Sequence, residues 1–358
     1  MLQGIVQNAT FSPPSQQASA ALPKVPTIEL APSLAISQVI KGCWQLSGGH
    51  RGEKASDHTA GAAAVQDFQR FAEVGVTTLD TADHYGPSEA LIGEYLKQAR
   101  RETQVLDKFC VFSGADMYHS KEFSFVAQSV NVARQRLGVP TVDLMQLYWQ
   151  DYSVRNYVPA AQHLGELRKQ GLIRHIGVTN FDVEHLRQIV AAGVPVVSNQ
   201  VQYSLLDRRP DNLMVPFCEQ HDIKLLPYGV VAGGFLSDTY LGLPASKVSV
   251  NTYSKAKYAG IIAQSGGWAW FQHLLETLHG IAQKHGVSIS NVASRWVLDR
   301  PGVPAIIVGA RNADHVQDHQ RLFTFQLDRA DNDAIQAVLD GGSRPAGDCY
   351  AWERGGIW

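Results

Sequence analysis

From residue 39 onward, short runs of β-branched and apolar residues alternate with amphipathic stretches of helical length. This alternation is typical of strand–helix–strand units, whose strands pair in parallel within one sheet. We predict eight strands, at residues 39–45, 77–83, 103–110, 142–149, 173–179, 196–203, 224–230 and 305–310. Eight parallel strands separated by helices form an α/β fold, the closed (β/α)8 or TIM barrel.

Helices are expected between these strands, for example at residues 61–74, 88–100, 123–137, 159–170 and 183–191. Several are followed by a glycine, which can adopt the left-handed conformation that ends a helix. Two longer segments, 231–267 and 341–358, interrupt the pattern. Because loops after the strand C-termini build the active site of a barrel, we expect these long loops to form pocket walls; the alternative is that they are surface excursions.

Residues 27–358 are predicted to form one barrel domain, since 45% hydrophobic and 18% charged residues suffice for a single large core. Residues 1–26 are rich in Ser, Gln, Ala and Pro and are expected to be a disordered N-terminal extension. A cytoplasmic location is expected. The alternative is an organelle-targeting peptide at residues 1–25, although Lys24 is the lone basic residue there.

The composition argues against several classes of partner. Lys and Arg (31) nearly balance Asp and Glu (33), which disfavours nucleic acid and anionic membranes as partners. No apolar run has the length needed to span a bilayer. The four cysteines are scattered and the 13 histidines show no ligand spacing, so no metal site is expected. A small molecule is the expected partner, and the oligomeric state is left open.

Three residues near the ends of successive strands suggest chemistry. Asp80 ends the second predicted strand, Tyr85 follows it, and Lys108 lies near the end of the third, with Asp107 as a competing acid. A tyrosine with a pKa near 10 can serve as an acid if Lys108 stabilises its phenolate and Asp80 holds Lys108. Such a tyrosine would protonate the alkoxide that hydride transfer to a carbonyl leaves. The alternative is a turn cap, a half-buried aromatic ring and a solvated lysine.

The chain resembles the aldo-keto reductases. The resemblance covers nearly the whole chain after residue 26, in segments 79–96, 142–151, 173–181, 198–208, 226–229 and 306–319. It implies an NAD(P)H-dependent oxidoreductase that interconverts an aldehyde or ketone and an alcohol by hydride transfer. A glycine-rich dinucleotide fingerprint is absent from the sequence, which disfavours a Rossmann dehydrogenase.

The resemblance also assigns residues. Asp80, Tyr85 and Lys108 match three of the family's four catalytic residues. Asn180 and Gln200 match the residues that bind the nicotinamide carboxamide, and Tyr228 matches the ring on which the nicotinamide stacks. The full set of expected cofactor-binding residues is Gly42, Cys43, Trp44, Thr179, Asn180, Gln200, Tyr228, Arg311, His315, Asp318 and His319. Arg311, near the adenine end, favours NADPH, with NADH possible because His315 stands where relatives often carry a second arginine.

The fourth catalytic residue departs from the family pattern, because Tyr148 replaces the usual histidine. Tyrosine can donate a hydrogen bond to substrate but cannot become a cation. We prefer a slower or narrower carbonyl reductase to a double-bond reductase or a cofactor-binding regulatory subunit with little turnover. The expected substrate pocket contains Trp44, Tyr85 and Trp149. Gly229 stands where relatives often have serine, which removes one hydrogen bond toward the cofactor phosphates.

Overall fold

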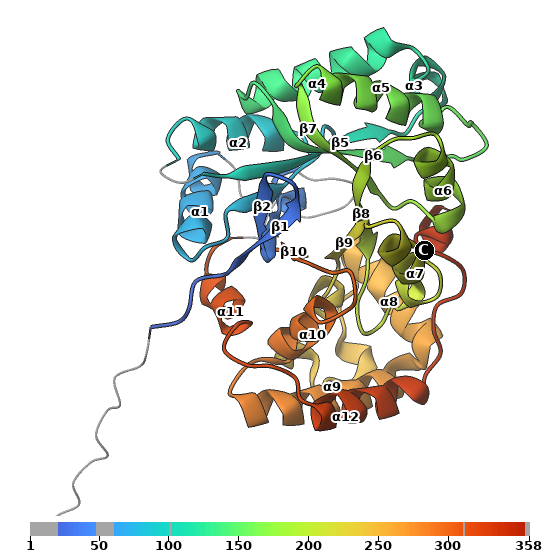
Figure 1. The fold of residues 1–358 in the computed structure, drawn as a ribbon. Coiled ribbons are helices and arrows are strands. Elements are labelled where there is room, and N and C mark those ends of the chain that lie inside the picture. Colours follow the sequence, from blue (N-terminus) through green and yellow to red (C-terminus); the bar gives the residue numbers. More distant parts are fainter. Residues whose placement is uncertain (1–20, 48–60, 100–101, 311, 355–358) are drawn as a thin grey trace, which may run out of the picture.

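A closed barrel of eight parallel strands forms the centre of the computed structural model, which describes residues 21–47, 61–99, 102–310 and 312–354 (Figure 1). The (β/α)8 fold is thereby confirmed. The barrel strands are β3 (Val39–Gly42), β4 (Thr78–Asp80), β5 (Gln104–Val111), β6 (Val142–Trp149), β7 (Ile173–Thr179), β8 (Val196–Gln202), β9 (Lys224–Tyr228) and β10 (Ile306–Gly309). Strand β10 closes the barrel by pairing with β3, in the register Ile306 to Val39.

Helices surround the barrel (Figure 1), and most of them bury apolar side chains in the core. They are α1 (Gly61–Glu73), α2 (Ser88–Leu96), α3 (Gly114–His119), α4 (Phe123–Leu137), α5 (Tyr157–Lys169), α6 (Val183–Ala191), α7 (Met214–Gln220), α8 (Tyr253–Ser265), α9 (Gly267–His285), α10 (Ile289–Leu298), α11 (Val316–Arg321), α12 (Arg329–Asp340) and α13 (Ala351–Arg354). Helix α4 ends as its sequence predicts, because Gly138 adopts a φ of 67° there.

The first two barrel strands are shorter than predicted. Strand β3 ends at Gly42, because the chain then turns into a short 3₁₀ helix, Trp44–Leu46. Strand β4 ends at Asp80, which lies beside Gly42 in the β3–β4 register. Both strands therefore stop at the same level, and the residues after them form the rim of the barrel mouth.

A hairpin that the sequence analysis did not predict precedes the barrel. Strands β1 (Thr27–Ala31) and β2 (Leu34–Ser37) pair antiparallel across a turn in which Ser33 has a φ of 63°. Apolar hairpin side chains, including Leu34 and Ile36, pack against residues from inside the barrel such as Leu144. Because Ser37 is hydrogen-bonded to Thr78 at the start of β4, the hairpin covers the N-terminal end of the barrel.

The two long segments are more ordered than the loops we expected. Residues 231–267 contain short 3₁₀ turns and helix α8, whereas the described part of the C-terminal segment contains α13. Among the described residues, no helix combines the length and apolar character that crossing a membrane requires. Residues 1–20 of the predicted extension lie outside the described residues. Residues 21–26 are described, and Val25 among them is buried and donates its backbone N–H to the carbonyl oxygen of Val74 at 2.8 Å.

Candidate active site

A buried polar network lies inside the barrel. Lys108 Nζ lies 2.6 Å from Asp80 Oδ1, and both side chains are 4% exposed. Lys108 also donates to the carbonyl oxygen of Thr81 at 2.8 Å. The other carboxylate oxygen, Asp80 Oδ2, accepts hydrogen bonds from Gln200 at 2.7 Å and Gln146 at 3.2 Å. The predicted Asp80–Lys108 pair therefore forms, and four strands contribute side chains to hold it.

Tyr85 lies directly beside this network. Its ring centroid is 5.2 Å from Lys108 Nζ, so the cation lies over the phenol ring. Burial raises the pKa of Tyr85, and Lys108 acts in the predicted direction by lowering it. Burial has the larger effect, so the phenol keeps its proton at neutral pH.

Asp107 does not compete for Lys108, because adjacent strand residues face opposite sides of the sheet. Its carboxylate instead accepts a hydrogen bond from the backbone N–H of Lys108 at 2.8 Å. Burial raises the pKa of Asp107, and the nearby acids Glu89 and Asp83 raise it further. Asp107 is therefore outside the polar network of the barrel interior.

Tyr148 contributes to the wall of the site. It is 6% exposed, and its hydroxyl donates to Gln150 Oε1. Its ring lies 5.0 Å from Phe112 and 6.3 Å from Tyr350. None of the contacts recorded for Tyr148 within the described residues is with Tyr85. The hydroxyl is thus engaged at the rim rather than with Tyr85.

Aromatic rings surround Tyr85. Trp44 packs edge-on against it at 5.1 Å, and His84 lies 4.7 Å away. Trp149, the third expected pocket residue, lies elsewhere: it is fully buried and its indole N–H donates to the carbonyl oxygens of Asp151 and Val154. The prediction for Trp149 is wrong, because strand alternation turns it away from the barrel interior that Tyr148 faces.

Tyr228 and Asn180 form the expected nicotinamide side. The Tyr228 hydroxyl donates to Asn180 Oδ1 at 2.9 Å, and Asn180 adopts a positive φ of 60°. Thr179 is buried beside them and donates to the backbone carbonyl of Gln200 at 3.2 Å. The amide nitrogen of Gln200 donates to Asp80, which links this side to the buried polar network.

At the end of the first barrel strand, the backbone but not the thiol of Cys43 can reach a cofactor. Cys43 is fully buried, and burial raises the pKa of its thiol to about 11. The prediction that Cys43 contacts the cofactor can therefore hold only for its backbone. Gly42 is tightly enclosed, because a Cβ there would lie 3.2 Å from both Ile307 and the carbonyl oxygen of Val308.

The adenine-end residues are only partly described, because Arg311 lies outside the described residues. His315 is exposed just before α11. Asp318 pairs with Arg321 at 2.9 Å. The ring of His319 stacks on Phe71 at 5.8 Å, and burial lowers its pKa to about 4, so it is neutral at pH 7.

A known protein family matches most of this sequence. The family model with the description 'Aldo/keto reductase family' matches residues 38–340. The chain belongs to the aldo/keto reductase family. This aldo/keto reductase is accordingly an NAD(P)H-dependent oxidoreductase that interconverts carbonyl groups and alcohols.

Individual relatives cover most of this aldo/keto reductase. The NADH-specific methylglyoxal reductase of Escherichia coli (strain K12) is 25% identical over 338 residues, which cover 86% of this chain and 96% of that protein. The glycerol dehydrogenase of Gluconobacter oxydans has a similar structure, with a TM-score of 0.73 at 23% identity, covering 92% and 98% of the two chains. An aldo-keto reductase from Klebsiella pneumoniae, solved with NADPH, gives a TM-score of 0.65 at 18% identity, covering 91% and 97%.

The C-terminal segment of this aldo/keto reductase is held at the barrel mouth by side-chain contacts. The sequence analysis expected a pocket wall here but did not predict these contacts. Arg209 lies 2.6 Å from Asp207 and 2.8 Å from Glu353 of α13, with all three side chains at most 1% exposed. The next residue, Arg354, donates to the carbonyl oxygens of Asn180 at 2.8 Å and Trp149 at 2.7 Å. Helix α13 therefore touches both the expected cofactor side and the end of β6.

Gln146 was also missed, although strand alternation gives a signal for it. It lies two residues before Tyr148 on β6 and is fully buried. Its amide nitrogen donates to Asp80 and its amide oxygen accepts from Gln200 at 3.1 Å. A glutamine on the inward face of an apolar strand therefore marks the polar network.

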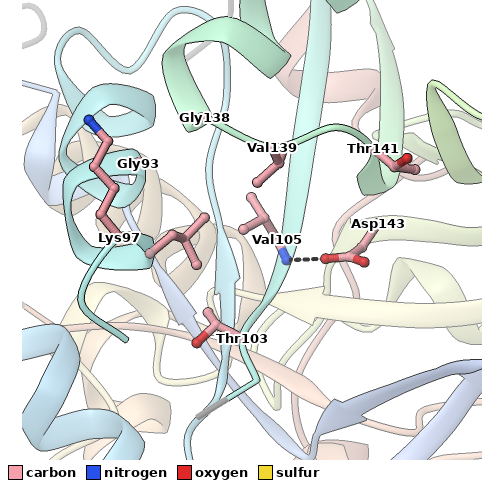
Figure 2. Close-up of a pocket in the computed structure, with 9 residues that line it drawn as sticks. Gly93, Lys97, Thr103, Val105, Gly138, Val139, Thr141 and Asp143 are labelled. Atoms are coloured by element: carbon pink, nitrogen blue, oxygen red, sulfur yellow. Dashed lines mark hydrogen bonds between the residues drawn. The ribbon is translucent and has the colours of Figure 1, made fainter. Parts of the chain in front are cut away.

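A pocket of about 260 Å³ lies away from this site, between α2, β5 and the turn before β6 (Figure 2). Lys97, Val105, Val139 and Asp143 are among its lining residues, and Asp143 accepts a hydrogen bond from the backbone N–H of Val105. These residues lie near the starts of β5 and β6, whereas Tyr85 lies beyond the end of β4. The pocket therefore belongs to the opposite end of the barrel.

Asp83, His84 and Cys110 offer ligand atoms within 4.8 Å of one another near Tyr85. One Asp83 oxygen already accepts a hydrogen bond from the backbone N–H of Cys110 at 3.0 Å. Burial raises the pKa of the Cys110 thiol, and Asp83 raises it further. That the protein has no metal site stays a prediction.

Proposed function

We propose that this protein is an NADPH-preferring reductase of small carbonyl compounds in which Tyr85 is the general acid. The observation that carries the proposal is the Asp80–Lys108 pair beneath the Tyr85 ring, within the barrel whose mouth also presents Tyr228 and Asn180. In the reverse direction, Tyr85 would act as the base for alcohol oxidation.

The residues at the mouth fit a nicotinamide. The Tyr228 ring is partly exposed, so it offers an aromatic face for stacking. Asn180 uses its amide oxygen to accept from Tyr228, and its amide nitrogen is suited to donate to a carboxamide oxygen. A bound nicotinamide dinucleotide would supply the hydride.

The chain's own residues supply the proton. Tyr85 donates its phenolic proton to the alkoxide oxygen, which is a stronger base than a phenolate. Lys108 stabilises the phenolate that remains, and Asp80 holds Lys108 charged and in place. Gln146 and Gln200 fix the Asp80 carboxylate by donating to its second oxygen.

The proposed cofactor preference rests on Arg311, whose guanidinium suits the extra phosphate of NADPH. Helix α11 follows Arg311 but has only six residues, so we do not count the backbone N–H groups at its start toward the phosphate site. The relatives differ in cofactor: the Klebsiella pneumoniae protein was solved with NADPH, whereas the Escherichia coli protein is NADH-specific, and the name of the latter supports a small carbonyl substrate. We expect a lower Kd for NADPH than for NADH in a direct titration.

The test of the proposed acid is Tyr85→Phe, with Tyr118→Phe as a control at a tyrosine that is 60% exposed. We expect Tyr85→Phe to lower kcat for aldehyde reduction by about 10²–10⁴, because it removes the acid but keeps the ring. The Kd for NADPH should change only a few-fold. Near wild-type turnover would remove Tyr85 from the mechanism. A wild-type protein that binds NADPH but turns over no aldehyde, quinone or diketone would instead be a cofactor-binding regulatory subunit.

A further inference from the structure

Lys257 brings a positive charge to the expected nicotinamide side from helix α8. It lies on α8, within the segment that interrupts the strand–helix rhythm. Its Nζ is 5.4 Å from the centre of the Tyr228 ring and 4.9 Å from the centre of the Tyr258 ring. The ammonium group therefore lies beside the ring that is expected to stack on the nicotinamide.

The charge of Lys257 is poorly balanced by the protein. Among the described residues, no carboxylate lies within ion-pair distance of its Nζ and no side chain accepts a hydrogen bond from it. Burial lowers its pKa, and Glu353 and Asp207 only partly oppose this. Those two acids are already paired with Arg209. An ammonium group with two aromatic faces and no acceptor is suited to receive an anion.

Tyr258 fixes α8 against the segment that follows Tyr228. A Cβ at Gly233 would lie 2.8 Å from the Tyr258 ring, and one at Gly229 would collide with the Tyr258 hydroxyl. The Tyr258 side chain thus fills the space that these two glycines leave. Residues 229–234 contain no cationic side chain, so the cation beside Tyr228 comes from α8.

We propose that Lys257 is a cofactor-binding residue that pairs with the phosphate nearest the nicotinamide. The proposal rests on the proposed function, because it takes Tyr228 as the stacking ring. In a nicotinamide dinucleotide, one ribose separates the ring from its first phosphate. A lysine over the stacking ring lies within that neighbourhood, and its flexible four-carbon stem can follow the phosphate.

The test measures binding by the wild-type protein, Lys257→Met and Lys257→Arg. Lys255→Met is the matched control, because Lys255 lies on the same helix and contacts the exposed Asn251. Titrations use NADPH, NADH and adenosine 2′,5′-bisphosphate, which lacks the phosphate on the nicotinamide side. We expect Lys257→Met to weaken NADPH and NADH alike by about tenfold or more, because both lose one charged hydrogen bond. Lys257→Arg should restore most of the affinity, and adenosine 2′,5′-bisphosphate should bind unchanged.

The possible failures are distinguishable. If wild-type protein binds neither NADPH nor NADH, the proposed function and the role of Lys257 both fail. If wild-type protein binds them and Lys257→Met binds them equally well, only the role of Lys257 fails. An equal loss for adenosine 2′,5′-bisphosphate would also overturn it, because the substitution would then act on the whole site. A thermal melt of each variant shows whether it is folded. If Lys257→Met does not fold, Lys257→Arg still tests the role of Lys257.

Discussion

The sequence resemblance matches Tyr148 to the position of the family's usual histidine, and in the structure its hydroxyl donates to Gln150. We predict that Tyr148→His raises kcat/KM for an aldehyde, because an imidazole at the strand end can donate to the developing oxyanion. One placed donor can be worth about 2.7–4 kcal/mol, and the gain should be well below that, since the smaller ring loses packing with Phe112. Tyr148→Phe is the control that removes only the hydroxyl. A drop in turnover for Tyr148→His at unchanged NADPH affinity would assign Tyr148 a role of its own.

The raised pKa of Tyr85 predicts opposite pH dependences for the two directions. Reduction needs the protonated phenol, so kcat should stay level through neutral pH and fall only above the ordinary tyrosine pKa of about 10. Oxidation needs the phenolate, so its kcat should rise over the same alkaline range. Measuring both directions from about pH 5 to 11 checks this. A fall in the kcat for reduction at neutral pH would contradict this prediction.

At the scale of elements, helix α13 depends on the buried pair of Arg209 and Glu353. We predict that Glu353→Ala lowers the free energy of unfolding by about 3–5 kcal/mol, because it leaves a buried guanidinium with one carboxylate in place of two. Urea unfolding measures the change, and Glu166→Ala, at a half-exposed surface pair, is the control. A loss below about 1 kcal/mol would mean that Asp207 alone satisfies Arg209.

The strands show how far local patterns predict the fold. Strands 142–149 and 173–179 were predicted with their observed ends, because both runs are rich in β-branched and other apolar residues. The same alternation that places Tyr148 inward would have excluded Trp149 from the pocket and indicated Gln146. The β1–β2 hairpin escaped prediction because its strands are short and gain their burial from the barrel interior, which is not a local property.

At the scale of the whole molecule, the site divides into parts that the sequence predicts and parts that depend on tertiary packing. Asp80, Tyr85 and Lys108 could be assigned together because each lies at or near a strand end, and strand ends meet at the barrel mouth. Lys257 could not be assigned in this way. Its position depends on how α8 docks over the glycines after β9, and no local periodicity encodes that docking.

Barrel closure has a consequence for how the protein is made. Strand β3 pairs with β10, so the seam joins the beginning and the end of the barrel sequence, and Gln38 of the hairpin–barrel junction also donates to Pro304. The ribosome synthesises β10 after all the other barrel strands, so one edge of β3 stays unpaired while most of the chain is synthesised. Contacts of such long sequence separation close slowly, and exposed strand edges invite aggregation. We therefore expect the nascent chain to need protection, by a chaperone or by its own partial folding, until the last strand emerges.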